Sequence, residues 1–284
     1  TLSSSSAASD VYKRQGLTKK EPFTCGPAIE ADGTRFRLWA PAVNGVEVVI
    51  FLPNKELIVS MTAEGDGWFE VLIPEAGDGA RYLFQINGDT RVPDPASRFQ
   101  PEDIFGQSQA VDTSAFVWRT HNWKGRPWSE TVLYELHVGA FTPEGTYNGV
   151  CSRLPYLANL GITAIELMPL CDFPGRHNWG YDGVMPFAPD ATYGTPDQLQ
   201  QLIDEAHNLG IMVFLDVVYN HFGPEGNFLH LYAPHFFTQR QQTPWGPAID
   251  FSQRNVRNFF IANALYWLQE YRFDGLRPVS YTHL

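Results

Sequence analysis

The sequence predicts a molecule in two parts, an N-terminal β-sandwich followed by a parallel α/β fold of the barrel type. Residues 23–112 contain short strand patterns separated by turns, without a helical period, whereas residues 131–277 alternate strand with helix. The long loops of the second part all follow strands, which favours a barrel with elaborated loops at its mouth. A doubly wound sheet is the alternative.

In the first part, apolar residues alternate with charged ones, as in strands that bury one face. Phe36 and Leu38 flank Arg37 in this way. Further strands are expected over residues 46–50, 68–73 and 82–86. The dipeptide Asn87-Gly88 after the last of these predicts the turn of a hairpin.

Three segments are expected to lie outside the two folded parts. Residues 1–15 are rich in Ser, lack periodicity and resemble translated adaptor sequence, so we predict a disordered, non-native tail. Residues 278–284 resemble such a tail as well. Residues 113–130 are predicted to be a linker, packed down by Trp118, Trp123 and Trp128.

In the second part, strands are expected over residues 132–141, 162–170 and 273–277, with a further strand starting at Ile211. Helices are expected over residues 148–160, 196–209 and 255–271. The second helix has the clearest start, because Thr195 is a suitable N-cap, Pro196 suits the first helical position and Gln198 completes a capping box.

Residues 211–221 are the most informative stretch. Five apolar residues run up to Asp216, as in a strand buried on both faces, and Asn220 and His221 follow near its carboxyl end. In a barrel of parallel strands, that end is where the loops converge and where chemistry takes place. The alternative is a purely structural strand whose Asp caps the next turn and whose His is satisfied in the core.

Composition excludes several classes of protein. A content of 44% hydrophobic and 18% charged residues is typical of a folded globular chain. With 20 basic and 31 acidic residues, the net charge is −11, which argues against nucleic acid and anionic membrane as partners. No apolar run is long enough to span a membrane. Cys25, Cys151 and Cys171 lack metal-ligand spacing, and we predict reduced thiols in a cytoplasmic protein.

Three motifs resemble signature regions of the α-amylase family of glycoside hydrolases. Asp-Val-Val-Tyr-Asn-His at residues 216–221 resembles the first region, and Phe-Asp-Gly-Leu-Arg at 273–277 resembles the start of the second. Asn-Trp-Gly-Tyr-Asp-Gly at 178–183 is similar to the loop after the second barrel strand. The resemblance implies an isoamylase-type, immunoglobulin-like β-sandwich at residues 23–112. It also implies the first half of a TIM (β/α)8 barrel at residues 131–277, truncated after its fourth strand.

Residues 134–145, 172–182 and 219–227 resemble one branch of this family, whose members release trehalose from maltooligosyl-trehalose. This implies a retaining hydrolase of trehalose biosynthesis that cleaves the α-1,4 bond next to the trehalose unit. It implies maltooligosyl-trehalose or a related α-glucan as the partner, and no cofactor or metal. A branching or debranching enzyme of the family and a non-catalytic α-glucan-binding protein are the alternatives.

The resemblance also implies roles for four residues. Tyr181 would stack on the pyranose at the cleavage subsite, and His221 would donate hydrogen bonds to sugar hydroxyls. Arg277 would hydrogen-bond the nucleophile and favour its ionised form. Asp216 would help to hold this cluster together.

The sequence departs from the family pattern directly after Arg277. The family continues Arg-x-Asp, and that Asp is the nucleophile, whereas Pro278 and Val279 follow here. A retaining glycosidase needs a nucleophile and an acid/base about 5–5.5 Å apart. We therefore expect the 284 residues to be an inactive fragment when isolated.

Two further carboxylates, Glu135 and Glu166, lie within the first two expected strands of the barrel. We predict that both are structural and lie away from the mouth, with His137 as the partner of Glu135, because a buried carboxylate must be paired or protonated. We also expect the strands that begin near residues 132 and 273 to be unpaired edges.

Overall fold

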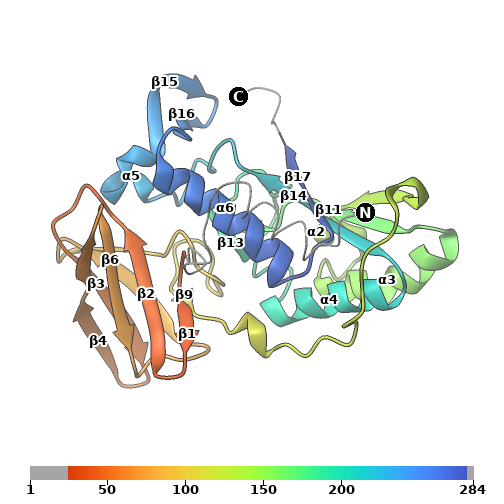
Figure 1. Cartoon of the computed structure of the whole chain (residues 1–284), viewed down its shortest axis with the longest axis horizontal. Coiled ribbons are helices and arrows are strands. Elements are labelled where there is room, and N and C mark those ends of the chain that lie inside the picture. The colour runs from red at the N-terminus through yellow and green to blue at the C-terminus, as the bar shows by residue number, and fades with distance from the viewer. Residues whose placement is uncertain (1–24, 280–284) are drawn as a thin grey trace.

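The computed structural model describes residues 25–279, so the tail expected at residues 1–15 and all but the first two residues of the tail expected at 278–284 lie outside the described residues. Figure 1 shows a β-sandwich on one side and a parallel sheet with its helices on the other, with a long helix running between them. Both parts of the fold therefore follow the order that the sequence predicts.

The sandwich consists of two antiparallel sheets. One has the order β1-β2-β6-β5, with the bounds Ala28–Glu30, Gly33–Trp39, Trp68–Ile73 and Thr62–Gly65. The other has the order β4-β3-β7-β8, with β9 also paired to β7, and the bounds Lys55–Ser60, Val46–Leu52, Arg81–Ile86, Thr90–Val92 and Ser108–Gln109. The predicted hairpin joins β7 to β8, where Asn87 and Gly88 have φ angles of 51° and 84°.

Alternating side chains from the two sheets form the sandwich core. Phe36 and Phe84 are fully buried and lie on either side of Tyr82, at ring-centroid distances of 4.7 and 5.8 Å. The phenol of Tyr82 donates to the buried carboxylate of Asp94 at 2.7 Å, which satisfies both polar groups inside the apolar core.

The second part is built on a four-stranded parallel sheet with the order β10-β11-β14-β17. Its strands are Leu133–Leu136, Ala164–Leu167, Met212–Val218 and Gly275–Val279. Neighbours in space are also neighbours in strand sequence, so right-handed crossovers place every connecting helix on one face of the sheet. This is the arrangement of a barrel wall, and the doubly wound alternative is wrong.

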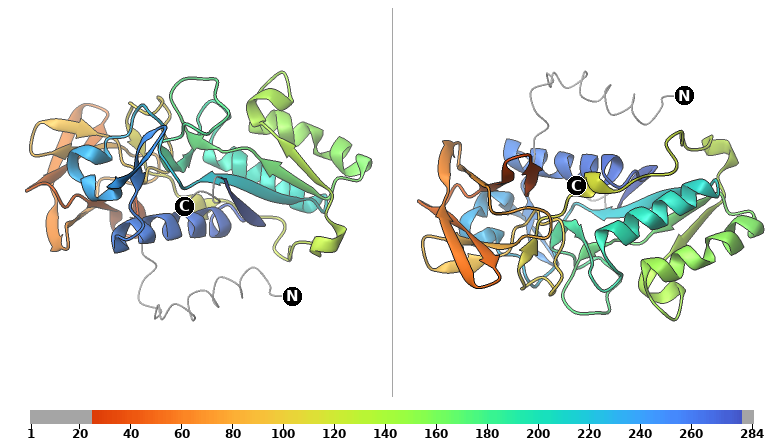
Figure 2. Two further views of the ribbon diagram at one scale, coloured as in Figure 1. Left: turned by 90° about the horizontal axis from the view of Figure 1, so that it is seen from above. Right: turned by 90° about the horizontal axis from the view of Figure 1, so that it is seen from below.

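The three connecting helices lie where the sequence predicts them: α3 at Tyr147–Leu160, α4 at Pro196–Asn208 and α6 at Arg254–Gln269. Figure 2 shows α3 and α4 running alongside each other over the sheet. Gly161 ends α3 with a φ angle of 92°, and the expected capping box at Thr195 and Gln198 is present. Among the described residues, no helix is long and apolar enough to cross a bilayer.

Two strands are shorter than predicted. The strand expected over residues 132–141 ends at Leu136, and a short helix, α2 (Val138–Phe141), follows. The strand expected over residues 162–170 ends at Leu167. Apolar residues continue beyond both ends, so the sequence pattern does not mark them. At the first end, the carbonyl of His137 accepts from Ala140 and Phe141, which turns the chain into α2.

The last strand also differs from expectation. β17 starts two residues later than predicted and continues past Arg277, with Pro278 and Val279 in register with Val217 and Val218. The segment assigned to a tail thus begins inside a strand. Pro278 is tolerated because β17 is an edge strand, where one side of the backbone needs no ladder partner. The edges expected at β10 and β17 are confirmed within residues 25–279.

The loops after the strands carry the remaining elements. β12 pairs with β13 in the loop region after β11, and β15 pairs with β16 in a hairpin after β14. Their bounds are Cys171–Asp172, Met185–Pro189, Phe237–Thr243 and Gly246–Ile249. Shorter helices are α5 (Leu229–Tyr232), η1 (Thr113–Ala115), η2 (Trp128–Glu130) and η3 (Pro234–Phe236).

The linker packs against the barrel part through its three tryptophans. Trp118 is buried, and Trp123 stacks on His207 with a centroid distance of 4.6 Å while its Nε1 donates to Asp274 at 2.8 Å. Trp128 contacts the ring of Phe214 in β14 edge-on, at a centroid distance of 6.0 Å, although the residue is 71% exposed. Cys25, Cys151 and Cys171 are free thiols, as predicted.

Candidate active site

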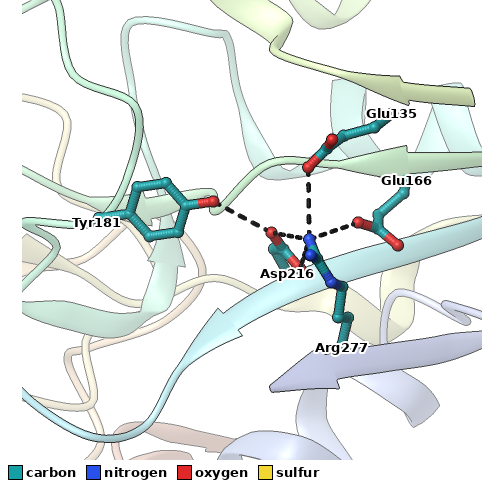
Figure 3. Close-up of polar contacts among 5 residues, drawn as sticks. All are labelled: Glu135, Glu166, Tyr181, Asp216 and Arg277. Atoms are coloured by element: carbon teal, nitrogen blue, oxygen red, sulfur yellow. Dashed lines mark hydrogen bonds and ion pairs between the residues drawn. The ribbon is translucent and has the colours of Figure 1, made fainter. Parts of the chain in front are cut away.

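Four charged side chains meet at the carboxyl end of the parallel sheet, one from each strand (Figure 3). Glu135 of β10 lies in register with Glu166 of β11, and Asp216 of β14 lies in register with Arg277 of β17. Phe214 of β14 is the register partner of Glu166, and Asp216 lies two residues further along the same strand. Because successive side chains of a strand point to opposite faces, Asp216 and Glu166 lie on the same face of the sheet, opposite the connecting helices.

A single nitrogen of Arg277 makes all the contacts of this cluster. Nη1 donates to Glu166 Oε1 at 2.9 Å and lies 3.0 and 3.2 Å from the two carboxylate oxygens of Asp216. Glu135 Oε1 is more distant, at 3.4 Å. The carboxylate of Asp216 has no exposed surface, whereas the side chain of Arg277 is 53% exposed. Arg277 therefore bridges a buried anion and the open face of the sheet.

Burial determines the proton affinity of these carboxylates. It raises the pKa of Asp216 from 3.8 to about 6, although the Arg277 charge opposes the change. Burial also raises the pKa of Glu166, again against the influence of Arg277. The nearby carboxylates, with that of Asp216 first, raise the pKa of Arg277, which stays charged.

Tyr181 is held beside this cluster by a rigid turn. Asn178 Nδ2 donates to Asp182 Oδ2 at 2.7 Å, and Asn178 Oδ1 accepts from the Gly180 amide at 2.8 Å. Gly180 has a φ angle of 91°, and a Cβ at that position would lie 2.1 Å from the Pro169 carbonyl oxygen, so glycine is required. The phenol of Tyr181 reaches Asp216 Oδ2 at 3.4 Å.

His221 supports Tyr181 from the other side. Its Nε2 donates to the Tyr181 carbonyl at 2.8 Å, and its Nδ1 lies 3.1 Å from the side-chain amide of Asn220. Burial lowers the pKa of His221, which favours the neutral ring, and this ring donates through Nε2 to the Tyr181 carbonyl. Donation from His221 to a sugar remains a prediction and requires exchange of one of these bonds.

The structure therefore brings Tyr181, Asp216, His221 and Arg277 together, and it adds residues that sequence reasoning missed. The indole of Trp245 stacks on His221 with a centroid distance of 3.8 Å and an interplanar angle of 14°. Trp245 lies between β15 and β16, and no period or motif in the sequence indicates that this hairpin folds back onto the strand ends. Together, these residues place aromatic side chains next to the cluster of carboxylates.

The expectation for Glu135 and Glu166 is wrong in two respects. Both lie one residue before the observed ends of their strands, so they belong to the mouth cluster and not to a separate structural pair. His137 does not pair with Glu135, because its Nε2 contacts the Asn178 carbonyl at 2.7 Å and the Tyr193 hydroxyl at 3.2 Å. The partner of both glutamates is Arg277.

Oxygens of Glu135, Glu166 and Asp216 lie within 4.8 Å of one another, the one such group among residues 25–279 that could hold a metal ion. Arg277 Nη1 contacts all three carboxylates. The positive charge that this group holds is therefore a guanidinium. Chemically, the arrangement can orient a further anionic or hydroxyl group against the remaining nitrogens of Arg277.

Comparisons with known proteins agree with this architecture. Residues 23–98 match carbohydrate-binding module 48, the isoamylase N-terminal domain, and residues 102–264 match the alpha amylase catalytic domain. The chain is 48% identical over 252 residues to a malto-oligosyltrehalose trehalohydrolase of Deinococcus radiodurans, covering 86% of the chain and 40% of that protein. For the same enzyme of Saccharolobus solfataricus, identity is 42% over 258 residues, with coverage of 90% and 45%.

A 1,4-alpha-glucan branching enzyme, GlgB 2 of Streptomyces avermitilis, is 34% identical over 265 residues, with coverage of 86% and 45%. The chain thus spans less than half the length of these curated relatives.

Solved structures show the same fold. A candidate alpha amylase from Salmonella typhimurium superimposes with a TM-score of 0.85 at 47% identity, covering 90% of this chain and 43% of that one. Pullulanase type I from Bacillus subtilis, complexed with maltose, gives 0.78 at 27% identity, with coverage of 90% and 42%. Because the catalytic-domain match spans more than half of the 284 residues, the chain belongs to the α-amylase family, with a carbohydrate-binding module 48 sandwich before its barrel strands.

Proposed function

We propose that the full-length protein carrying this chain is a glycoside hydrolase that releases trehalose from maltooligosyl-trehalose. The observation that carries the proposal is the 48% identity to the Deinococcus radiodurans enzyme, which extends over both parts of the chain. The site supports it, because a rigid aromatic side chain and a fixed guanidinium lie side by side at the carboxyl ends of barrel strands.

In this proposal the chain contributes the binding half of the site. Tyr181 offers a flat face for a pyranose, and its orientation is fixed by Asn178 and by the hydrogen bond from His221 to its carbonyl. Arg277 presents its free nitrogens to the carboxylate that attacks the sugar, and its charge keeps that carboxylate ionised. Cleavage then proceeds by double displacement through a covalent glycosyl-enzyme.

The carboxylates of the cluster are poor candidates for the two catalytic groups. Glu166 is 8% exposed and Asp216 is fully buried, and both are bound to Arg277, so a sugar cannot reach them. In the family pattern the nucleophile stands where this chain has Val279. We therefore expect residues 1–284 alone to release no trehalose, and Val279→Asp alone not to restore activity, because the acid/base would still be missing.

The test is to supply the full-length protein with maltooligosyl-trehalose and, separately, with glycogen, and to measure trehalose and new chain ends. We expect trehalose release to be the dominant activity. Tyr181→Ala should lower kcat/KM for that reaction by about tenfold or more, since stacking against the sugar is lost. Tyr156→Ala is the matched control, because Tyr156 is 61% exposed on α3, away from the site.

A branching or debranching enzyme is the second candidate, favoured by the 34% identity to the Streptomyces avermitilis branching enzyme. Glucan transfer or debranching that exceeds trehalose release would establish it instead. Binding of α-glucans without any cleavage by the full-length protein would contradict both and indicate a binding protein.

A further inference from the structure

The cluster at the strand ends contains more acceptors than its donor can serve. Arg277 Nη1 carries two hydrogens, yet four oxygens from three carboxylates lie within 3.4 Å of it. Nε and Nη2 of Arg277 have no partner among residues 25–279. The carboxylates therefore bind one nitrogen of the guanidinium, Nη1, and leave Nε and Nη2 free to bind a further acceptor.

The two glutamates contribute unequally to the binding of Nη1. Glu166 Oε1 is 2.9 Å from Nη1 and its side chain is 8% exposed, whereas Glu135 Oε1 is 3.4 Å away and its side chain is 53% exposed. A contact shielded from water is stronger and more directional than an exposed one. Asp216 holds Nη1 from the neighbouring strand β14, so the guanidinium is fixed between two buried carboxylates on adjacent strands.

We propose that Glu166 is a positioning residue for Arg277, which fixes the guanidinium so that Nε and Nη2 face the attacking carboxylate. This role rests on the proposed function, because it acts on the nucleophile of a retaining hydrolase. Glu166 does not touch the sugar. It acts through Arg277, and its loss allows the guanidinium to turn about the remaining contacts to Asp216 and the exposed Glu135.

The role has a consequence for the pH profile. The titratable groups facing Asp216 are Arg277, Glu166, Glu135 and Tyr181. The charge of Glu166 raises the pKa of Asp216, and the charge of Arg277 lowers it. Replacing Glu166 by Gln removes the first influence and leaves Asp216 as the buried carboxylate that holds Arg277, with the exposed Glu135 beside it, so Asp216 ionises at lower pH.

The experiment compares three variants of the full-length protein, Glu166→Gln, Glu166→Asp and Glu135→Gln, by kcat, KM and the pH dependence of kcat/KM. Glu166→Gln should lower kcat by about tenfold with little change in KM, because an interaction made in the transition state is lost. The acid limb of its profile should move to lower pH, because Asp216 must be ionised to hold Arg277 and ionises at lower pH in this variant. Glu135→Gln makes the same chemical change at the register neighbour and should produce clearly smaller effects on kcat and on the acid limb of the pH profile.

Glu166→Asp keeps the charge but shortens the side chain, so kcat should fall while the acid limb stays in place. It also keeps the test decisive if Glu166→Gln does not fold, as judged by circular dichroism. Equal effects of Glu166→Gln and Glu135→Gln, or full kcat in Glu166→Asp, would overturn the positioning role. If the parent enzyme acts on another α-glucan, the same comparison is made with that activity, so failure of the proposed function is recognised separately.

Discussion

The sandwich and the parallel sheet bury their side chains by different rules. In β2, buried and partly exposed residues alternate, because one face packs on the other sheet and one faces outward. All of β11 is buried, and in β14 Asp216 is buried among apolar residues. The strands of the sandwich thus keep charged side chains out of the core, whereas β11 and β14 of the parallel sheet bury charge near their carboxyl ends. Buried charge is costly unless it is paired, and Arg277 provides that pairing here.

The two parts also differ at their edges. In the sandwich, the edge strand β4 exposes one large apolar residue, Ile58, among Lys55, Glu56 and Ser60, and the edge strand β5 exposes none. In the parallel sheet, the edge strand β10 exposes Leu133 and Tyr134, at 42% and 38%. Exposed apolar edge strands promote pairing between chains. The comparison therefore identifies β10 as the weak point of the 284-residue chain.

The largest expected effect concerns association. We expect residues 1–284 to form oligomers or aggregates in size-exclusion chromatography with light scattering. Leu133→Lys places a charge on the edge strand β10 and should shift the chain strongly toward the monomer. Ile58→Lys is the matched control on the edge strand β4, with a similar exposure of 45%, and should leave the distribution unchanged. A monomeric parent chain would refute the claim that β10 is an edge strand that promotes association.

The second effect concerns packing in the two sheets. Phe36→Ala removes a fully buried ring from the sandwich core and should lower the unfolding free energy by about 3–5 kcal/mol. Phe214→Ala removes a half-buried ring that contacts Trp128 edge-on, and it should cost less than half as much. Urea unfolding followed by tryptophan fluorescence measures both. Equal losses would mean that the parallel sheet is packed as tightly as the sandwich.

The third effect is the pH dependence of stability. Burial raises the pKa of Asp94 in the sandwich, and of Asp216 in the parallel sheet, from 3.8 to about 6. The folded state therefore binds these protons more tightly than the unfolded state, so each group lowers the unfolding free energy as pH rises from about 3.8 to about 6.

Asp94→Asn and Asp216→Asn should each remove part of this slope, by less than about 1.4 kcal/mol per pH unit for each proton. Urea unfolding of both variants and the parent at several pH values between 4 and 7 tests this. Unchanged slopes would show that the two carboxyl groups titrate normally.

The smallest expected effect on stability concerns the interface between the sandwich and the barrel part. The guanidinium of Arg98 lies over the rings of Tyr266 and Phe187, at 4.4 and 5.0 Å, and donates to the Cys25 carbonyl at 2.7 Å. Arg98→Lys should cost about 1–2 kcal/mol and broaden the calorimetric unfolding transition. Arg37→Lys changes a similar contact, to Trp68 within the sandwich, and should leave the width of the transition unchanged.

The comparison also explains how much the sequence could predict. Alternation predicted the sandwich strands β2, β3, β6 and β7, and the capping residues Thr195 and Gln198 predicted a helix start, because these patterns are local. Asp216 and Arg277 could be placed together because the carboxyl ends of parallel strands meet at one edge of a sheet. The family resemblance supplied the role of Tyr181, which no periodicity indicates.

The errors arose where local pattern and tertiary contact differ. The residues that follow Leu136 and Leu167 are mainly apolar, so the sequence pattern extends both strands too far and leaves Glu135 and Glu166 in mid-strand, away from the mouth. Their bonds to Arg277 span 142 and 111 residues, and no local pattern reports a contact of that separation. Trp245 reaches His221 through the fold of a hairpin, which depends on packing that the sequence pattern does not record.

The central claim is that the carboxyl end of the parallel sheet, around Tyr181 and Arg277, binds the α-glucan. A crystal structure of the full-length protein with a maltooligosaccharide bound tests it most directly. We predict a pyranose stacked on the ring of Tyr181, within hydrogen-bonding reach of the His221 and Arg277 cluster. A glucan bound elsewhere, with these side chains untouched at saturating ligand, would contradict the account.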